Sequence, residues 1–105
     1  MTIKVQAINF AYFQTIDELL AGFDFTVCQF AYDGEKLYCG DHSLWDLARR
    51  RIVINNVRFP IATLRHMLKY NRQGFFACSG ALTEFIRKTV EMGPQAYNDK
   101  YKYID

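Results

Sequence analysis

Apolar and polar residues alternate from Ile3 to Phe10, and this period of two predicts a β-strand. A helix is expected to follow, because the four residues from Thr15 to Glu18 form a capping box in which Thr15 caps the helix and Glu18 reaches back toward the cap. Gly22 is the residue at which this helix is expected to end. The chain is therefore predicted to begin as a strand followed by a helix.

The next stretch, residues 23–40, predicts a β-hairpin. It is rich in β-branched and aromatic residues and contains Asp33-Gly34, a pair that is favoured in two-residue type I′ turns. With these two residues as the turn, Cys28 faces Cys39 directly and both thiols lie on one face of the sheet. A disulfide between them is geometrically possible in oxidising conditions, but we do not expect one in a cytoplasm.

The second half of the chain predicts three helices and one more strand. A short helix opens at Ser43 with another capping box, and the basic triplet that follows it suits a helix C-terminus. Residues 52–59 have the composition of a strand, which the turn-prone Asn55-Asn56 could divide into two short pieces. Residues 60–72 form a helical pattern with proline in the first turn. A last helix is expected over residues 79–92, closed by a Gly-Pro pair.

This order, β-α-β-β-α-β-α-α, predicts an α+β fold in which a small antiparallel or mixed sheet, with its hairpin turn at Asp33-Gly34, packs against about four helices. We expect a single domain over residues 1–93 and a polar, tyrosine-rich tail over residues 94–105 that orders only by docking. We expect neither a signal peptide nor a membrane span, because the apolar runs are too short. Three cysteines without a secretory signal fit a reducing cytoplasm.

Charge is segregated along the chain, although the formal net charge is only +2. Residues 1–46 carry two lysines against seven acids, whereas residues 47–83 carry seven basic residues and no acid. Such a field attracts a polyanion or an acidic protein surface to the basic stretch, unless the acidic stretch folds against it and neutralises it. The acidic residues expected at a partner surface are Asp17, Glu18, Asp33, Glu35, Asp41 and Asp46.

Part of the basic charge is expected on one face of the predicted helix 60–72, because Arg65, Lys69 and Arg72 are spaced at i, i+4 and i+7. The apolar residues expected on the opposite face are Ile61, Leu64, Met67 and Leu68. The full set of candidates for contact with phosphate or with a partner is Arg49, Arg50, Arg51, Arg58, Arg65, Lys69, Tyr70 and Arg72. A basic outer face is also the ordinary way in which an amphipathic helix stays soluble.

The cysteines raise the question of a metal or of a nucleophile. A zinc site from Cys28, Cys39, His42 and Cys78 is conceivable, but the paired Cys-x2-Cys spacing is missing, and packing of buried thiols is favoured. Cys78 precedes a helix start, which would lower its pKa, yet nothing in the spacing brings His42 or His66 to it as a base. We therefore expect no metal, no cofactor and no catalysis.

The segments FDFTVCQFAYDGEKLYCG and VRFPIATLRHMLKYNRQGFF resemble phage and large-DNA-virus proteins of the nucleotidyltransferase-like, polymerase-β-superfamily fold. The resemblance covers roughly residues 8–76. That family carries its catalytic unit in a Gly-Ser turn followed by paired carboxylates that hold two metal ions. Because this chain has no Gly-Ser dipeptide and no Asp-x-Asp on its first strand, the resemblance implies the C-terminal half of such a fold without the catalytic half.

Three functional hypotheses fit these observations. The preferred one is a non-catalytic binding protein of a phage or mobile element that inhibits a host nucleic-acid-handling defence factor, in the manner of an anti-CRISPR protein, by protein–protein contact in the bacterial cytoplasm. The alternative is a compact domain that binds nucleic acid or nucleotide phosphate through the basic stretch 49–72. The third is the accessory half of a split nucleotidyltransferase. The identity of the partner and the oligomeric state stay open at this stage.

Overall fold

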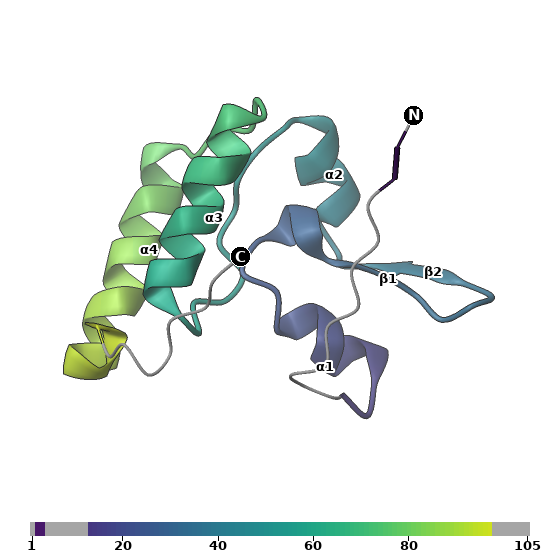
Figure 1. The fold of residues 1–105 in the computed structure, drawn as a ribbon, viewed down its shortest axis with the longest axis horizontal. Coiled ribbons are helices and arrows are strands. Elements are labelled where there is room, and N and C mark those ends of the chain that lie inside the picture. Colours follow the sequence, from purple (N-terminus) through teal and green to yellow (C-terminus); the bar gives the residue numbers. More distant parts are fainter. Residues whose placement is uncertain (1, 4–12, 98–105) are drawn as a thin grey trace.

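Four α-helices and a two-stranded antiparallel hairpin form the fold in the computed structural model, which describes residues 2–3 and 13–97 (Figure 1). The predicted α+β class is confirmed, and the order of the helices and of the hairpin agrees with the prediction. The strand expected from Ile3 to Phe10 lies outside the described residues, apart from Ile3 itself. The elements are α1 (Ile16–Ala21), the 3-10 helix η1 (Thr26–Cys28), β1 (Phe30–Tyr32), β2 (Leu37–Cys39), α2 (Ser43–Ala48), α3 (Pro60–Arg72), α4 (Ser79–Met92) and the 3-10 helix η2 (Gly93–Tyr97).

The ends of the helices follow from local chemistry. Thr15 caps α1 as predicted, since its Oγ1 accepts a hydrogen bond from the backbone N–H of Glu18 at 3.1 Å. Gly22 is the C-cap of this helix. The helix α3 begins at its predicted proline and is followed by Gly74 at a φ of +94°, a left-handed conformation that favours glycine.

The hairpin differs from the prediction in its register. Phe30 pairs with Cys39 and Tyr32 with Leu37, so the loop contains four residues, 33–36, instead of two. The side chain of Asp33 explains the longer loop, because its Oδ1 accepts hydrogen bonds at 2.8 Å from the backbone N–H groups of both residues 35 and 36. The loop is therefore closed by this side chain together with a backbone hydrogen bond, from the N–H of Asp33 to the carbonyl of Lys36 at 3.3 Å.

The predicted pairing of Cys28 with Cys39 is wrong for the same reason, and also because the first strand starts later than expected. Cys28 is the last residue of η1 and lies outside the sheet. Its Sγ lies 3.3 Å from the hydroxyl oxygen of Tyr70 on α3. The three cysteines are free thiols.

The strand predicted over residues 52–59 is also wrong. This segment forms one isolated bridge, between Ile54 and Phe25, and a second isolated bridge joins Arg51, just before it, to Phe76. Asn55 explains the irregular course, because its side-chain amide donates to the carbonyl of Ala21 at 3.1 Å and to that of Phe23 at 2.8 Å. The segment is thus tied to the end of α1 by a side chain, which takes the place of a regular ladder.

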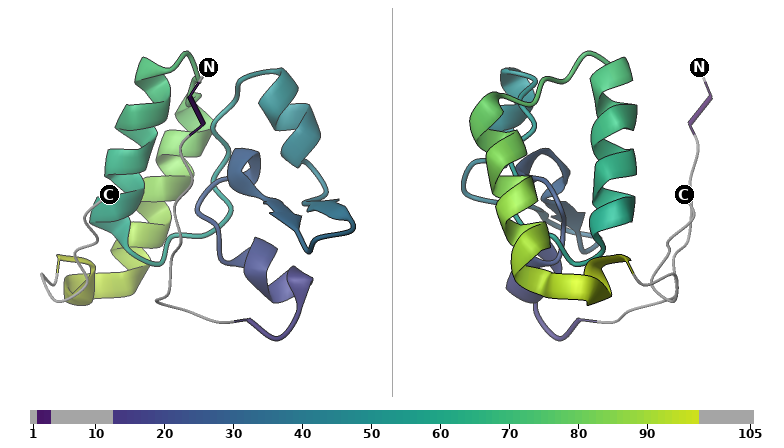
Figure 2. Two further views of the ribbon diagram at one scale, coloured as in Figure 1. Left: turned by 45° about the vertical axis from the view of Figure 1, so that its right-hand side comes forward. Right: turned by 90° about the vertical axis from the view of Figure 1, so that its left-hand side faces the viewer.

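The core lies between the η1 region, the irregular segment and α3. Its buried residues are Phe25, Val27, Ile52 and Met67. Tyr70 extends it, with its ring edge-on to Phe25 at 5.8 Å between ring centroids. Figure 2 shows that α3 and α4 lie on one side of the molecule, whereas the hairpin and α1 lie on the other. The tail predicted from residue 94 begins as η2, which contacts α3 and α4.

The helix α2 is held by polar groups that face the core. Asp46 is buried, and its Oδ2 accepts a hydrogen bond from the hydroxyl of Thr26 at 2.6 Å. Ser43 is also buried, and its hydroxyl donates to the carbonyl of Gly40 at 2.9 Å. The capping box predicted here is wrong, because His42 occupies the cap position without a side-chain hydrogen bond and Asp46 makes a tertiary contact instead.

We predict that Asp46→Ala lowers the free energy of unfolding by about 1 to 3 kcal/mol, because it leaves the buried Thr26 hydroxyl without an acceptor. Urea unfolding followed by circular dichroism measures this change. The exposed neighbour Asp41 serves as the control, and Asp41→Ala should alter stability by less than about 0.5 kcal/mol. Equal effects of the two substitutions would contradict the role assigned to the buried carboxylate.

Candidate functional site

The outer side of α2 is an exposed patch made of Leu44, Trp45 and Arg49, which we call the α2 surface. Because Ser43 and Asp46 face the core, the residues between them point outward, and Leu44 and Trp45 are 62% and 63% exposed. The guanidinium carbon of Arg49 lies 5.3 Å from the centroid of the Trp45 ring, within the range of a cation–π interaction. This patch combines a large aromatic ring, an aliphatic side chain and a positive charge.

A second exposed patch lies on the hairpin. Tyr32 and Leu37 are cross-strand partners, so their side chains lie on the same face, and they are 68% and 70% exposed. The other face carries Ala31 and Tyr38, which are half-buried. We call the patch of Tyr32, Leu37 and the exposed carboxylate of Glu35 the hairpin face.

Within the loop of the hairpin, Asp33 has a structural task. Hydrogen bonds from the backbone N–H groups of Lys36 and Glu35 hold the pKa of this carboxyl below its usual value. The hydroxyl of Tyr38 donates to the other carboxylate oxygen at 3.0 Å, and this bond to a negative group raises the pKa of Tyr38. The carboxylate therefore shapes the loop as well as contributing charge.

Most residues of the predicted acidic surface are exposed. Asp17 and Glu18 lie in the first turn of α1, and Glu18 accepts a hydrogen bond from the backbone N–H of Gln14 at 3.2 Å. Asp41, like the two loop carboxylates of the hairpin, is exposed. Asp46 is the exception, because its burial at 6% exposure removes it from any partner surface.

The predicted basic residues are exposed, but they form more than one group. Arg49, Arg50 and Arg51 follow α2, and Arg58 lies over the ring of Phe59 at 5.3 Å. Arg65, Lys69 and Arg72 lie along α3. Tyr70 does not join them at the surface, since it is half-buried between Phe25 and Phe75 and its hydroxyl lies beside the Cys28 thiol.

The apolar face predicted for α3 needs a correction. Of the four residues expected there, only Met67 is buried; Ile61, Leu64 and Leu68 are 43%, 41% and 55% exposed. Their helical positions place them on the solvent side, next to the basic residues and not opposite them. The buried side is instead formed by Thr63 and Met67, with Pro60 and Ala62 at its margin. We call the exposed side, formed by Ile61, Leu64, Leu68, Arg65, Lys69 and Arg72, the α3 face.

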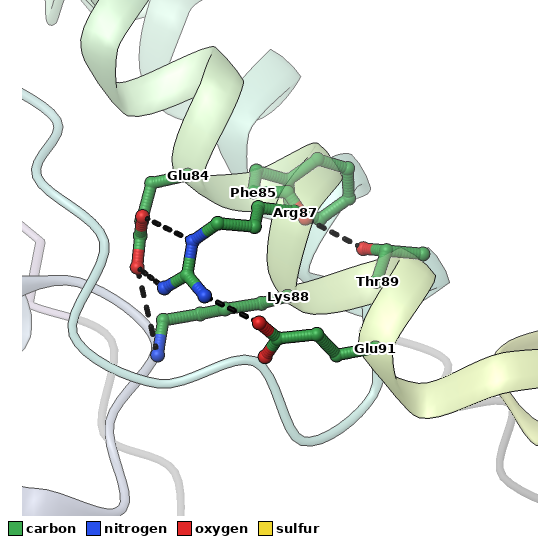
Figure 3. A network of polar contacts seen from close by, with 6 residues as sticks. All are labelled: Glu84, Phe85, Arg87, Lys88, Thr89 and Glu91. Carbon is green, nitrogen blue, oxygen red and sulfur yellow. Dashed lines mark hydrogen bonds and ion pairs between the residues drawn. The ribbon is translucent and has the colours of Figure 1, made fainter.

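The helix α4 presents a different surface, whose charges pair with one another (Figure 3). The guanidinium of Arg87 donates to Glu84 at 3.0 Å and 2.5 Å and also to Glu91, while the ammonium of Lys88 lies 3.8 Å from Glu84. These pairs lie within one helix at spacings of three and four residues. Since the charges satisfy each other, this surface attracts a charged partner less than α3 does.

The thiols do not assemble a metal site in the described part of the chain, where no three histidine, cysteine or acidic side chains come together. Burial raises the pKa of Cys28, which keeps its thiol protonated beside Tyr70. Cys39 is exposed on β2. Cys78 is the cap residue of α4, and the backbone amides of Ala81 and Gly80 lower the pKa of its thiol.

One polar cluster was missed at the level of sequence. The carboxylate of Asp24 accepts a hydrogen bond from the hydroxyl of Thr63 at 3.0 Å, and the same oxygen lies 3.0 Å from Nδ1 of His66. Burial raises the pKa of Asp24, but the contacts with His66 and Thr63 lower it by more, so that the net shift is downward. In the sequence, this cluster could have been recognised from an acid inside an apolar run together with Thr63 and His66, which are spaced to lie on one side of the predicted helix. His66 therefore contacts Asp24, and this cluster links α3 to the segment that follows α1.

Comparison with known proteins gives one match. A family model described as Gabija anti-defense 2 family protein matches residues 1–50. No curated protein and no solved structure matches the chain. The similarity agrees with an anti-defence inhibitor of phage origin, the class of function expected from the sequence, and the comparisons give no support to a nucleotidyltransferase-like origin. In the described residues no helix is long and apolar enough to cross a membrane.

The matched segment contains α1, η1, the hairpin and α2. It therefore includes the α2 surface and the hairpin face but not the α3 face. Sequence reasoning missed the α2 surface, because it assigned Ser43 to a capping box and Asp46 to an acidic partner surface and gave Leu44 and Trp45 no role. The structure buries the polar residues and exposes the apolar ones.

We predict that the Asp24 cluster makes stability depend on pH at acid values. Since the folded pKa of Asp24 lies below the unfolded value of about 3.8, its contribution is present above pH 4 and is lost as the pH falls through the folded pKa. Urea unfolding at pH 7, 4 and 3 should show Asp24→Asn less stable than wild type at pH 7, with the difference shrinking toward pH 3. Asp41→Asn is the exposed control, and a constant difference for Asp24→Asn across this range would refute the prediction.

Proposed function

We propose that this chain is a non-catalytic anti-defence protein that binds a host protein of the Gabija defence and inhibits it by contact. The observation that carries the proposal is the similarity of residues 1–50 to the Gabija anti-defense 2 family, together with the exposed α2 surface inside that segment. The proposed partner is a host defence protein in the bacterial cytoplasm.

The α2 surface has the composition of an interaction hot spot. Tryptophan and arginine are the residues that most often dominate binding energy at protein interfaces, and here Arg49 stacks on Trp45 before any partner arrives. This stacking reduces the rotamer freedom that both side chains would lose on binding, and a partner that covers them gains the burial of a large aromatic ring. The fold does not need the ring in its core, because α2 is anchored by Ser43 and Asp46.

The acidic residues of the matched segment fit the same proposal. Asp17, Glu18 and Asp41 are exposed there, and exposed carboxylates repel nucleic acid while they attract a basic surface. A defence protein that handles nucleic acid carries such a basic surface. The acids would speed the encounter with it, and the α2 surface would supply the affinity.

We predict that Trp45→Ala abolishes protection of phage in cells that carry the Gabija defence. The same substitution should weaken binding to the purified defence protein by about 2 kcal/mol, roughly 30-fold. Phage plating and calorimetric titration measure the two effects. The melting temperature should barely change, because the ring is 63% exposed.

The matched control is Leu82→Ala, which removes an exposed apolar side chain on α4, outside the matched segment. This control should retain both protection and binding. If Trp45→Ala protected phage as well as wild type, or if both variants failed alike while remaining folded, the α2 surface would not be the site.

A second function, binding of nucleic acid, is favoured by the three exposed basic residues of α3. Replacing Arg65, Lys69 and Arg72 by glutamine would then weaken binding to duplex and flatten its log–log salt dependence by just under one unit for each lost contact. Fluorescence anisotropy over a series of salt concentrations measures the slope. If wild type binds duplex only weakly at low salt, the phosphate-binding alternative is refuted and the inhibitor proposal stands.

A further inference from the structure

Among the described residues, no ion pair joins the hairpin carboxylates Asp33 and Glu35 to Lys69 or Arg72 of α3. The hairpin projects from one side of the fold and α3 lies on the other, as the views in Figure 1 and Figure 2 agree. Within the chain the hairpin packs through β1 against α1.

The hairpin face is a small apolar ridge with negative charge beside it. Tyr32 and Leu37 stand side by side on the exposed face of the ribbon, and each exposes more than two thirds of its surface. Glu35 is exposed in the loop at the end of this ridge, and the carboxylate of Asp33, although hydrogen-bonded within the loop, adds a second negative charge. Lys36, also exposed in this loop, offsets one of them, so the loop keeps a net charge of one negative.

The α3 face is the complement of this ridge. Ile61, Leu64 and Leu68 recur at spacings of three and four residues, so they form an apolar stripe along the solvent side of the helix. Lys69 and Arg72 border the stripe, and residues 60–72 contain no acid. A helix of 13 residues is about 20 Å long, which is enough to receive the end of a short hairpin.

We propose that the hairpin face of one copy of this chain docks on the α3 face of a second copy. The partner is a second copy because both members of the complementary pair, an apolar centre bordered by acids and an apolar centre bordered by bases, are present on the same molecule. Docking buries apolar side chains that a single copy leaves exposed, and it brings opposite charges together at the rim. The contact joins two different surfaces. Made twice about a two-fold axis it gives an isologous dimer, and made only once per pair of copies it is heterologous and extends into a ring or a chain.

This contact differs from the proposed binding of a defence protein, because it does not use the α2 surface. It is tested by reversing charge at one residue on each side, in the full chain. Wild type should associate at 50 mM salt in light scattering coupled to size exclusion, and association should weaken at 500 mM salt because exposed charges are screened. Glu35→Lys and Lys69→Glu should each weaken association by about tenfold or more, since each places like charges opposite one another.

The decisive variant carries both substitutions, Glu35→Lys and Lys69→Glu, in one chain. It restores opposite charge at the contact and has the same formal net charge as wild type, so association should return toward the wild-type level. An equimolar mixture of the two single variants should likewise associate more strongly than either alone, because the reversed hairpin of one meets the reversed helix of the other. Neither result follows from a general effect of net charge.

The matched controls reverse charge elsewhere. Asp17→Lys lies on α1 and Arg58→Glu lies in the loop before α3, and both residues are exposed. These variants should associate as wild type does, and so should Trp45→Ala, whose behaviour separates this proposal from the binding of a defence protein. A second probe, Leu68→Ser, removes part of the apolar stripe and should weaken association without altering the circular dichroism spectrum.

Three outcomes would overturn the proposal. Wild type could remain monomeric at millimolar concentration in 50 mM salt. Association could persist unchanged in both single charge reversals. Finally, the double variant could stay dissociated while folded. Circular dichroism and thermal melting show whether each variant folds. Where one variant does not fold, the folded variants, each mixed with wild type, supply the test.

Discussion

The structure depends on the burial of Phe25 within a short segment whose neighbours contact two helices, α2 and α3. Phe25 is fully buried and lies against Tyr70 of α3. On one side of it, Asp24 contacts Thr63 and His66 of α3; on the other, the hydroxyl of Thr26 donates to Asp46 of α2. This stretch, which leads into η1, therefore joins two helices to the core.

This arrangement leaves a small core and much apolar surface outside it. The buried cluster contains four residues, Phe25, Val27, Ile52 and Met67, whereas the hairpin, α2, α3 and α4 all expose large apolar side chains. Polar anchors make this possible, since α2 is fixed by a buried carboxylate and hydroxyl and can therefore direct Leu44 and Trp45 to solvent. Exposed aromatic and aliphatic residues in such numbers are a property of proteins that bind other proteins.

The surfaces divide the chain into parts with different tasks. The α2 surface and the hairpin face both lie in the segment that is similar to the Gabija anti-defense 2 family, while the α3 face lies beyond it. The proposed contact with a defence protein uses the first surface, and the proposed contact between copies joins the other two. Charge segregation along the sequence serves both proposals, because the hairpin, which carries Asp33 and Glu35, and α3, which carries Lys69 and Arg72, lie on different sides of the molecule (Figure 2).

The sequence by itself determined those features that depend on neighbouring residues only. Thr15 as a cap, Gly22 as a helix end and the extent of helix 60–72 were predicted correctly, because capping, glycine at a helix end and proline in the first turn act over four residues or fewer. The presence of a hairpin followed in the same way from composition. The charge pattern required no structure at all.

Tertiary structure alone decided what each segment meets. The course of residues 52–59 was set by the amide of Asn55 reaching the end of α1, whereas the hairpin register, set by the side chain of Asp33 within its own loop, was a local feature that the sequence reasoning missed. The burial of Asp46 and the exposure of Leu64 likewise depend on contacts between residues distant in sequence. Periodicity indicates that a helix has two faces, but which face is covered depends on the elements that pack against it, and that information is not local.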